Sequence, residues 1–142
     1  IAAPLAIGIA IYVLFRPSSL VGFSVLKKIG LFEIVEVARS LVRPLKSYVW
    51  DWVIYSLPDA LWTFSMVLFF GLVWLPFSRQ AAILAALSAT IISVFTELLQ
   101  LQGAISGIFD PIDIILKLLF ALIAIILISF YLRKSTRHEL NH

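Results

Sequence analysis

Ionisable residues gather at one end of three apolar segments, where a membrane helix would meet the membrane boundary. Asp59 lies near the start of one segment, Glu97 near the end of the next, and Asp113 and Lys117 near the start of the last. An ionisable side chain in the apolar part of a spanning helix costs roughly 2.5–3.5 kcal/mol on insertion scales, so it normally faces a partner or a wet cavity. The pattern therefore predicts a polar pocket at one face of a helical bundle.

Glu97 is the residue for which a purely structural explanation is weakest. It falls near the C-terminal end of its segment, where the negative end of the helix dipole disfavours an anion. A carboxylate there needs the amine of Lys117, a proton or an interfacial partner. Gln100 follows about one helical turn later and adds an amide to the same region. We expect these three side chains to belong to the polar pocket.

The other acidic residues each have a structural explanation beside the functional one. Asp110 precedes Pro111, as an N-cap precedes a proline at the first helical position, and capping is a sufficient reason for it. Asp113 and Lys117 stand four residues apart in the favourable order, so they can neutralise each other. Asp59 is a first-turn acid, which the positive end of the helix dipole favours. From sequence alone, both explanations stay open.

The chain offers few of the residue types that catalysis or metal binding requires. It has no cysteine, and its two histidines, His138 and His142, both lie in the C-terminal tail. An intramembrane histidine centre, a zinc site and a thiol nucleophile are therefore excluded. The acidic residues could hold a cation or form an aspartyl pair, but no Gly-rich motif supports such a pair. We expect no enzyme activity, no metal and no cofactor.

The composition of the chain is typical of a membrane protein. Of its 142 residues, 62% are hydrophobic and 13% are charged. Soluble domains usually carry about twice that charged fraction. The apolar runs are continuous and long enough for spanning helices, whereas a β-barrel needs short alternating segments. The net charge of +3 comes from loops and tail, which suits anionic lipid better than nucleic acid. We predict an all-α polytopic membrane protein.

Four apolar segments are the predicted transmembrane helices of a single membrane domain. They cover residues 1–15, 57–77, 81–101 and 112–132. The first segment reaches only about 22 Å as a helix, short of the roughly 30 Å hydrocarbon core. We therefore expect this helix to continue upstream of Ile1.

Residues 18–56 connect the first two spans and have the character of an interfacial segment. Within Leu31–Val42, polar side chains recur every three or four residues from Glu33 onward, and apolar side chains lie largely opposite. This spacing predicts an amphipathic helix lying in the membrane interface. Tryptophan, tyrosine and lysine residues follow it, as in an interfacial belt.

The third predicted span has a face of small residues. Ala81, Ala85, Ala89 and Ser93 recur every four positions and lead to Glu97. Small residues at this spacing let membrane helices approach closely. We therefore expect Glu97 to lie on the packed face and to point into the bundle.

Motifs around the acidic residues resemble the VanZ-like family of small membrane proteins. The run Glu97-Leu98-Leu99-Gln100, a Gly-containing loop and the run Asp110-Pro111-Ile112-Asp113 follow the family's "E-L-x-Q" and "D-x-x-D" order. Ser56-Leu57-Pro58-Asp59 is similar to the Pro-Asp start of an earlier span of the family. The resemblance covers about residues 58–132. The resemblance implies an envelope protein of the bacterial inner (cytoplasmic) membrane, in a family linked by its name-giving member to glycopeptide (teicoplanin) resistance.

The first functional hypothesis is a polar pocket that binds a lipid-linked or glycan head group. In it, Lys117 meets an anionic group, Glu97 and Asp59 set its orientation or carry a proton, and Trp62 packs beside it. Membrane lipids are the expected partners. The candidate ligand-binding residues are Asp59, Trp62, Glu97, Gln100, Asp110, Asp113 and Lys117.

The second hypothesis is a small accessory subunit of a larger membrane complex, with other integral membrane subunits as partners. The chain is short, and it departs from the family pattern at Ala60 and Lys117, where the family often has Lys and Asn. An ion conduit is a weaker third hypothesis, because the centres of all four predicted spans lack ionisable residues.

Overall fold

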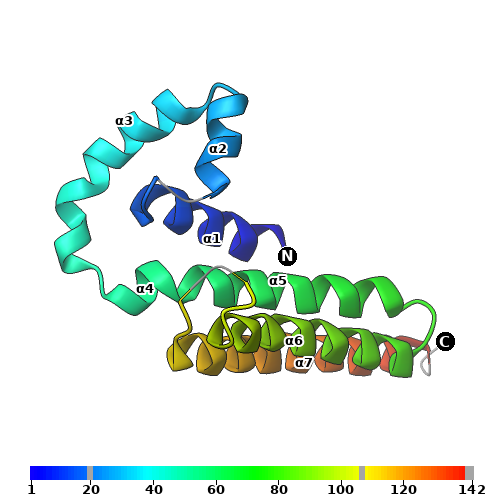
Figure 1. The fold of residues 1–142 in the computed structure, drawn as a ribbon. Helices are drawn as coiled ribbons and strands as arrows, with labels where there is room; N and C mark the ends of the chain where they lie inside the picture. Colours follow the sequence, from blue (N-terminus) through cyan, green and yellow to red (C-terminus); the bar gives the residue numbers. More distant parts are fainter. Residues whose placement is uncertain (19–20, 106–107, 140–142) are drawn as a thin grey trace.

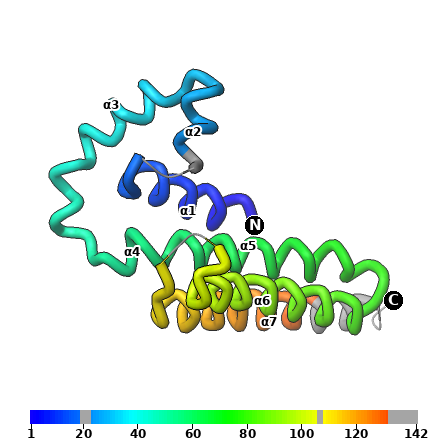
Figure 2. The backbone as a smooth tube through the Cα atoms, viewed as in Figure 1, coloured from blue at the N-terminus to red at the C-terminus, as the bar shows by residue number. Residues whose placement is uncertain are grey.

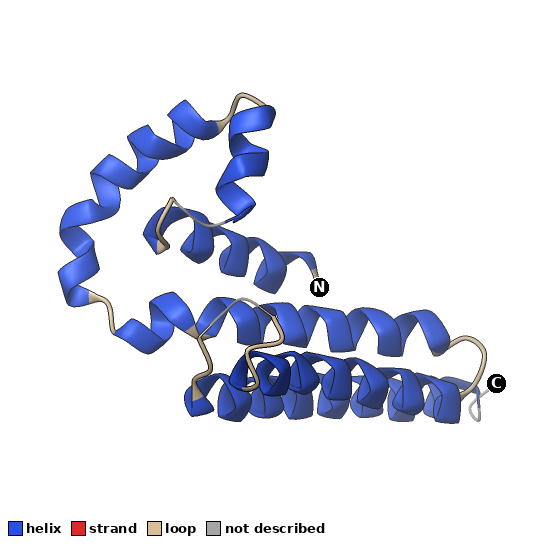
Figure 3. Cartoon of the chain, viewed as in Figure 1, coloured by secondary structure: helices blue, strands red, loops and turns tan. Residues whose placement is uncertain are grey.

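The computed structural model is all-α over the residues that it describes, which are 1–18, 21–105 and 108–139. Helices make up nearly all of this chain, and the loops between them are short (Figure 3). In chain order the elements are α1 (Ala2–Phe15), α2 (Val21–Lys28), α3 (Phe32–Val42), the 3-10 helix η1 (Arg43–Tyr48), α4 (Asp51–Tyr55), α5 (Leu57–Trp74), α6 (Arg79–Leu101) and α7 (Pro111–Glu139).

The last three helices form an up-down-up bundle, and α1 lies along the outer side of α5 (Figure 1). All three are long and apolar enough to cross a membrane, over Leu57–Trp74, Arg79–Leu101 and Pro111–Tyr131. They correspond to the predicted segments 57–77, 81–101 and 112–132, with boundaries shifted by a few residues. Three such helices indicate an integral membrane protein.

The N-terminal helix α1 is shorter, with 14 residues, and runs antiparallel to α5 (Figure 1). It approaches α5 closely at Gly8, where an added Cβ would lie 3.0 Å from the Trp62 indole and 3.2 Å from the carbonyl oxygen of Pro58. This crossing brings the C-terminal end of α1 beside the start of α5. A membrane crossing by α1 stays a prediction.

The apolar core of the bundle lies in the half remote from the acidic residues. Small side chains let the three helices meet there, and Gly71 is the closest point, since an added Cβ would collide with Cδ1 of Ile128. The core residues are Val67, Leu68, Ala86, Ala89, Ala121, Ala124 and Ile128.

Local capping fixes the turn between α6 and α7. Gly103, at φ +69°, follows α6 in the left-handed conformation that glycine adopts freely. Asp110 begins α7, because its carboxylate accepts the backbone N–H of Ile112 at 2.9 Å. The capping interpretation of Asp110 is therefore confirmed. The end of α6 consequently lies beside the start of α7.

The connection between α1 and α5 contains four short helices and arches away from the bundle at the end where α5 and α7 begin (Figure 2). The amphipathic helix predicted at Leu31–Val42 is confirmed as α3, whereas α2, η1 and α4 were not predicted. The outer side of α3 exposes Ile34, Val37 and Leu41, each by more than 60%. An apolar face of this kind suits a lipid interface, which stays a prediction.

Candidate functional site

A buried ion pair joins α6 to α7 at the polar end of the bundle. The Lys117 Nζ lies 2.5 Å from the Glu97 Oε1, and their side chains are only 7% and 2% exposed. The same Nζ approaches the carbonyl oxygen of Ser93 at 3.5 Å. Glu97 thus lies on the packed face of α6, as predicted, and Lys117 is the partner that its position requires.

Pairing of Lys117 with Asp113, one explanation offered for Lys117, is wrong. Across the described residues, the ion pairs within 4.0 Å are Arg16–Asp59, Arg39–Glu36 and Lys117–Glu97. The long lysine side chain reaches the neighbouring helix instead of its own preceding turn. There its ammonium meets the Glu97 carboxylate, and two opposite charges buried together attract each other strongly.

Asp59 is held by a residue that sequence reasoning passed over. Arg16, which follows the last residue of α1, lies 3.5 Å from the Asp59 carboxylate. Its guanidinium also donates to the backbone oxygens of Ile54, at 3.3 Å, and Tyr55, and it packs over the rings of Tyr12 and Tyr55. One sequence feature could have indicated this contact. Arg16 ends an apolar helix that runs antiparallel to the segment containing Asp59.

A short chain of hydroxyl groups continues from the ion pair toward α5. The Thr63 Oγ1 and the Ser93 Oγ are 2.5 Å apart and hydrogen-bonded. Thr63 also donates to the carbonyl oxygen of Asp59 at 2.9 Å, and Thr96 donates to that of Ser93 at 2.7 Å. These contacts hold Thr63, Ser93 and Thr96 in place near Glu97. None of them involves a carboxylate oxygen of Glu97.

A cavity of about 320 Å³ opens beside this network, between α5, α6 and Lys117 of α7. Its lining combines three ionisable groups with hydroxyl, amide and aromatic side chains. Five predicted site residues are brought together in it, namely Asp59, Trp62, Glu97, Gln100 and Lys117. The remaining lining residues are Thr63, Met66, Ile92, Ser93 and Thr96.

Two predicted site residues do not line this cavity. Asp110 caps α7. Asp113 is buried behind the cavity, at 8% exposure, and lies near Ser56. The Asp113 Oδ1, the Ser56 Oγ and the Glu97 Oε2 are all buried with no hydrogen-bond partner in the described part of the chain. A buried polar atom normally has a hydrogen-bond partner, so these three unpartnered oxygens need an explanation.

Coordination of a metal ion has no support from the geometry. Within residues 1–18, 21–105 and 108–139, no group of three or more His, Cys, Asp or Glu side chains could hold an ion. Asp59 faces Arg16, Glu97 faces Lys117 and Asp113 lies near Ser56, so the three acids do not converge on one point.

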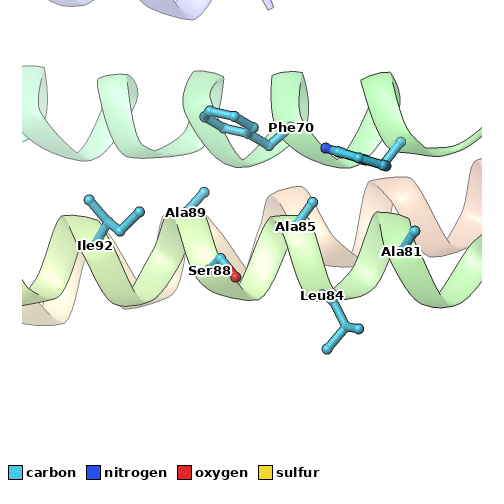
Figure 4. A pocket seen from close by; sticks show the side chains of 8 residues that line it. Phe70, Ala81, Leu84, Ala85, Ser88, Ala89 and Ile92 are labelled. Atoms are coloured by element: carbon cyan, nitrogen blue, oxygen red, sulfur yellow. The ribbon is translucent and has the colours of Figure 1, made fainter.

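A second hollow, of about 390 Å³, lies between α5 and α6 in the apolar half (Figure 4). Ala81, Ala85 and Ala89 point from α6 toward α5, where Phe70 lies, and Leu84 points away. Ala81 and Ala85 are only half-buried, because the fully packed stripe is displaced to Ala82, Ala86, Ala89, Ser93 and Glu97.

No protein-family model, no curated protein and no solved structure matches this chain. The resemblance to the VanZ-like family therefore stays a prediction. The function has to be argued from the geometry of the polar cavity.

Proposed function

We propose that this chain is a non-catalytic integral membrane protein of the cell envelope whose polar cavity binds a lipid-linked or glycan head group. One observation carries the proposal. Glu97 lines the cavity, and its Oε2 is buried with no hydrogen-bond partner among the described residues. An unsatisfied buried carboxylate oxygen is costly, and a ligand that donates a hydrogen bond to it would remove that cost.

The cavity wall favours a hydroxyl-bearing ligand. Glu97 supplies an acceptor, and the amide of Gln100 supplies both a donor and acceptors. Trp62, 45% exposed, offers a flat apolar surface beside them. A sugar ring combines hydroxyl groups at its edge with apolar C–H faces, so its chemistry is complementary to this wall.

Lys117 has a positioning role in this proposal and does not meet the ligand. Two of the three N–H donors of its ammonium group are engaged by the Glu97 Oε1 and the Ser93 carbonyl oxygen, and the carboxylate balances its charge. This differs from the sequence-based hypothesis, in which Lys117 met an anionic group. The lysine holds one carboxylate oxygen of Glu97, and the other has no partner among the described residues.

The proposed setting is a four-span protein with α3 in the interface. The antiparallel packing of α1 on α5 and the exposed apolar side of α3 support this placement. The order of Glu97, Gln100, Asp110 and Asp113 along the chain supports membership of the VanZ-like family. The proposed location is the bacterial inner membrane.

The proposal is tested by native mass spectrometry of the protein extracted from its own membrane in a mild detergent. We expect the wild-type protein to retain a hydroxyl-bearing lipid or glycan. Gln100→Leu removes a polar cavity group without touching the ion pair, and should lose the retained mass. The matched control is Gln80→Leu, at an exposed site at the other end of α6, which should keep it. Equal retention by both variants would contradict the proposal.

The second candidate function, an accessory subunit, has one observation in its favour. The hollow in Figure 4 is lined by small side chains of α6, which let helices approach closely in lipid. If this function is correct, the same extraction yields the chain with fixed additional polypeptides, and the isolated chain is unstable. A monodisperse isolated protein would count against it.

A further inference from the structure

A third cavity, distinct from the polar cavity, lies where the end of α1 meets α3 and η1. It measures about 350 Å³. Three basic residues, Arg39, Arg43 and Lys46, line it together with one acid, Glu36. Apolar side chains at the end of α1 complete the wall, among them Leu14 and Phe15.

One of the three cations already has structural partners. Arg39 lies 3.1 Å from the Glu36 carboxylate, donates to the carbonyl oxygen of Val13 at 2.7 Å and packs over the ring of Phe23. It therefore ties α3 to α1 and satisfies the last turn of α1.

The other two cations are uncompensated. Neither Arg43 nor Lys46 forms an ion pair with any residue in the described ranges. Glu36 is the one acid in the lining, and Arg39 engages it. The cavity consequently carries an excess of two positive charges.

The surroundings of these charges match the boundary of a lipid bilayer. Leu14 and Phe15 of α1 give the cavity an apolar wall beside Arg43 and Lys46, and the opposite face of α3 exposes Ile34, Val37 and Leu41. Basic side chains beside an apolar surface attract anionic lipid, whose phosphate and acyl chains need both kinds of contact. The excess positive charge and the apolar wall from α1 together favour an anionic lipid as the occupant.

We propose that this cavity binds the phosphate of an anionic phospholipid, with Arg43 and Lys46 donating to its oxygens. Arg39 holds the cavity open by fixing α3 on α1. The acyl chains lie along Leu14 and Phe15 at the end of α1. This site is separate from the polar cavity at Glu97 and would anchor the interfacial segment.

The test compares lipid retention by native mass spectrometry after adding phosphatidylglycerol or phosphatidylcholine with matched acyl chains to the delipidated protein. We expect preferential retention of one phosphatidylglycerol. Each basic group near a membrane surface contributes about a fivefold gain in affinity, so the Arg43→Gln, Lys46→Gln double variant should bind about 25-fold more weakly. Both residues are exposed, and circular dichroism checks that the variant keeps its helices.

The matched control is Lys28→Gln with Arg79→Gln, which removes the same charge from two exposed residues outside the cavity. It should retain phosphatidylglycerol as the wild type does. Equal weakening in both double variants would show general charge attraction and overturn the site. Displacement of the lipid by equimolar inorganic phosphate would show a soluble anion site and overturn the assignment to lipid.

Discussion

In the apolar half of the bundle, Ala86, Ala121 and Ala124 let the helices meet with at most 1% of each side chain exposed. In the polar half, the same three helices surround a cavity of about 320 Å³ and leave the Glu97 Oε2 without a partner. A chain that needed only to pack could continue the small-residue stripe to the end of α6. On our proposal, a ligand in the polar half supplies the hydrogen bond that the Glu97 Oε2 lacks.

The largest expected effect comes from breaking the buried ion pair. Lys117→Met leaves the Glu97 carboxylate buried and uncompensated, and should lower the free energy of unfolding by about 3–5 kcal/mol. The measurement is loss of helicity in a denaturing-detergent titration. Adding Glu97→Gln to Lys117→Met should restore most of the stability, because no buried charge is then left alone. A single variant as stable as the wild type would show that the pair is not buried.

An intermediate effect should come from crowding the apolar half. Gly71→Ala places a Cβ against Cδ1 of Ile128, and overpacking of this kind should cost about 1–3 kcal/mol in the same titration. Ile128→Val shortens the opposing side chain, so the double variant should lose less stability than the sum of the two single changes. Strict additivity would mean that the helices are not in close contact there.

A smaller effect should follow from removing the hydroxyl contact beneath the cavity. Ser93→Ala deletes the 2.5 Å hydrogen bond to Thr63, and such bonds between membrane helices are worth about 0.6 kcal/mol on average. Ser88→Ala, at an exposed position on the same helix, is the matched control and should leave stability unchanged. Identical unfolding curves for the two variants would show that the hydrogen bond between Thr63 and Ser93 does not stabilise the protein.

The smallest effect on stability is expected inside the cavity itself. Gln100→Leu changes a half-buried wall residue that takes no part in the ion pair, and should shift the free energy of unfolding by no more than about 0.5 kcal/mol. Its effect on ligand retention should nevertheless be large. A large loss of stability would instead make Gln100 a structural residue and weaken the contrast between the two halves.

Much of the helical architecture could be predicted from composition and run length. Continuous apolar runs identified α5, α6 and α7, and the four-residue spacing of small side chains on α6 placed Glu97 on the packed face. Asp110 was identified as a cap from its position before Pro111. These features are local, so the sequence alone carries their signal. The short helices α2, η1 and α4 escaped prediction because each is shorter than the stretch of about 11 residues over which a period is normally read.

The polar site could be predicted only in part, because its contacts join different helices. The position of Asp59, Glu97 and Lys117 at one end of the predicted spans indicated that they lie together, and this was correct. Spacing within one helix suggested that Lys117 pairs with Asp113. In the structure, the Lys117 ammonium instead pairs with Glu97 of the neighbouring helix. Arg16 was missed because its link to Asp59 depends on how α1 packs on α5, which no periodicity reveals.

Cysteine accessibility tests the central contrast most directly, and the chain has no native cysteine to interfere. Gln100→Cys places a thiol in the wall of the polar cavity, and Ala124→Cys places one in the fully buried apolar core. Both variants are treated with a membrane-impermeant maleimide in open membrane fragments, and again after denaturation. We expect Gln100→Cys to react in the native membrane, more slowly when the retained ligand is present, and Ala124→Cys to react only after denaturation. Failure of Gln100→Cys to react until the protein is unfolded would contradict an open polar cavity.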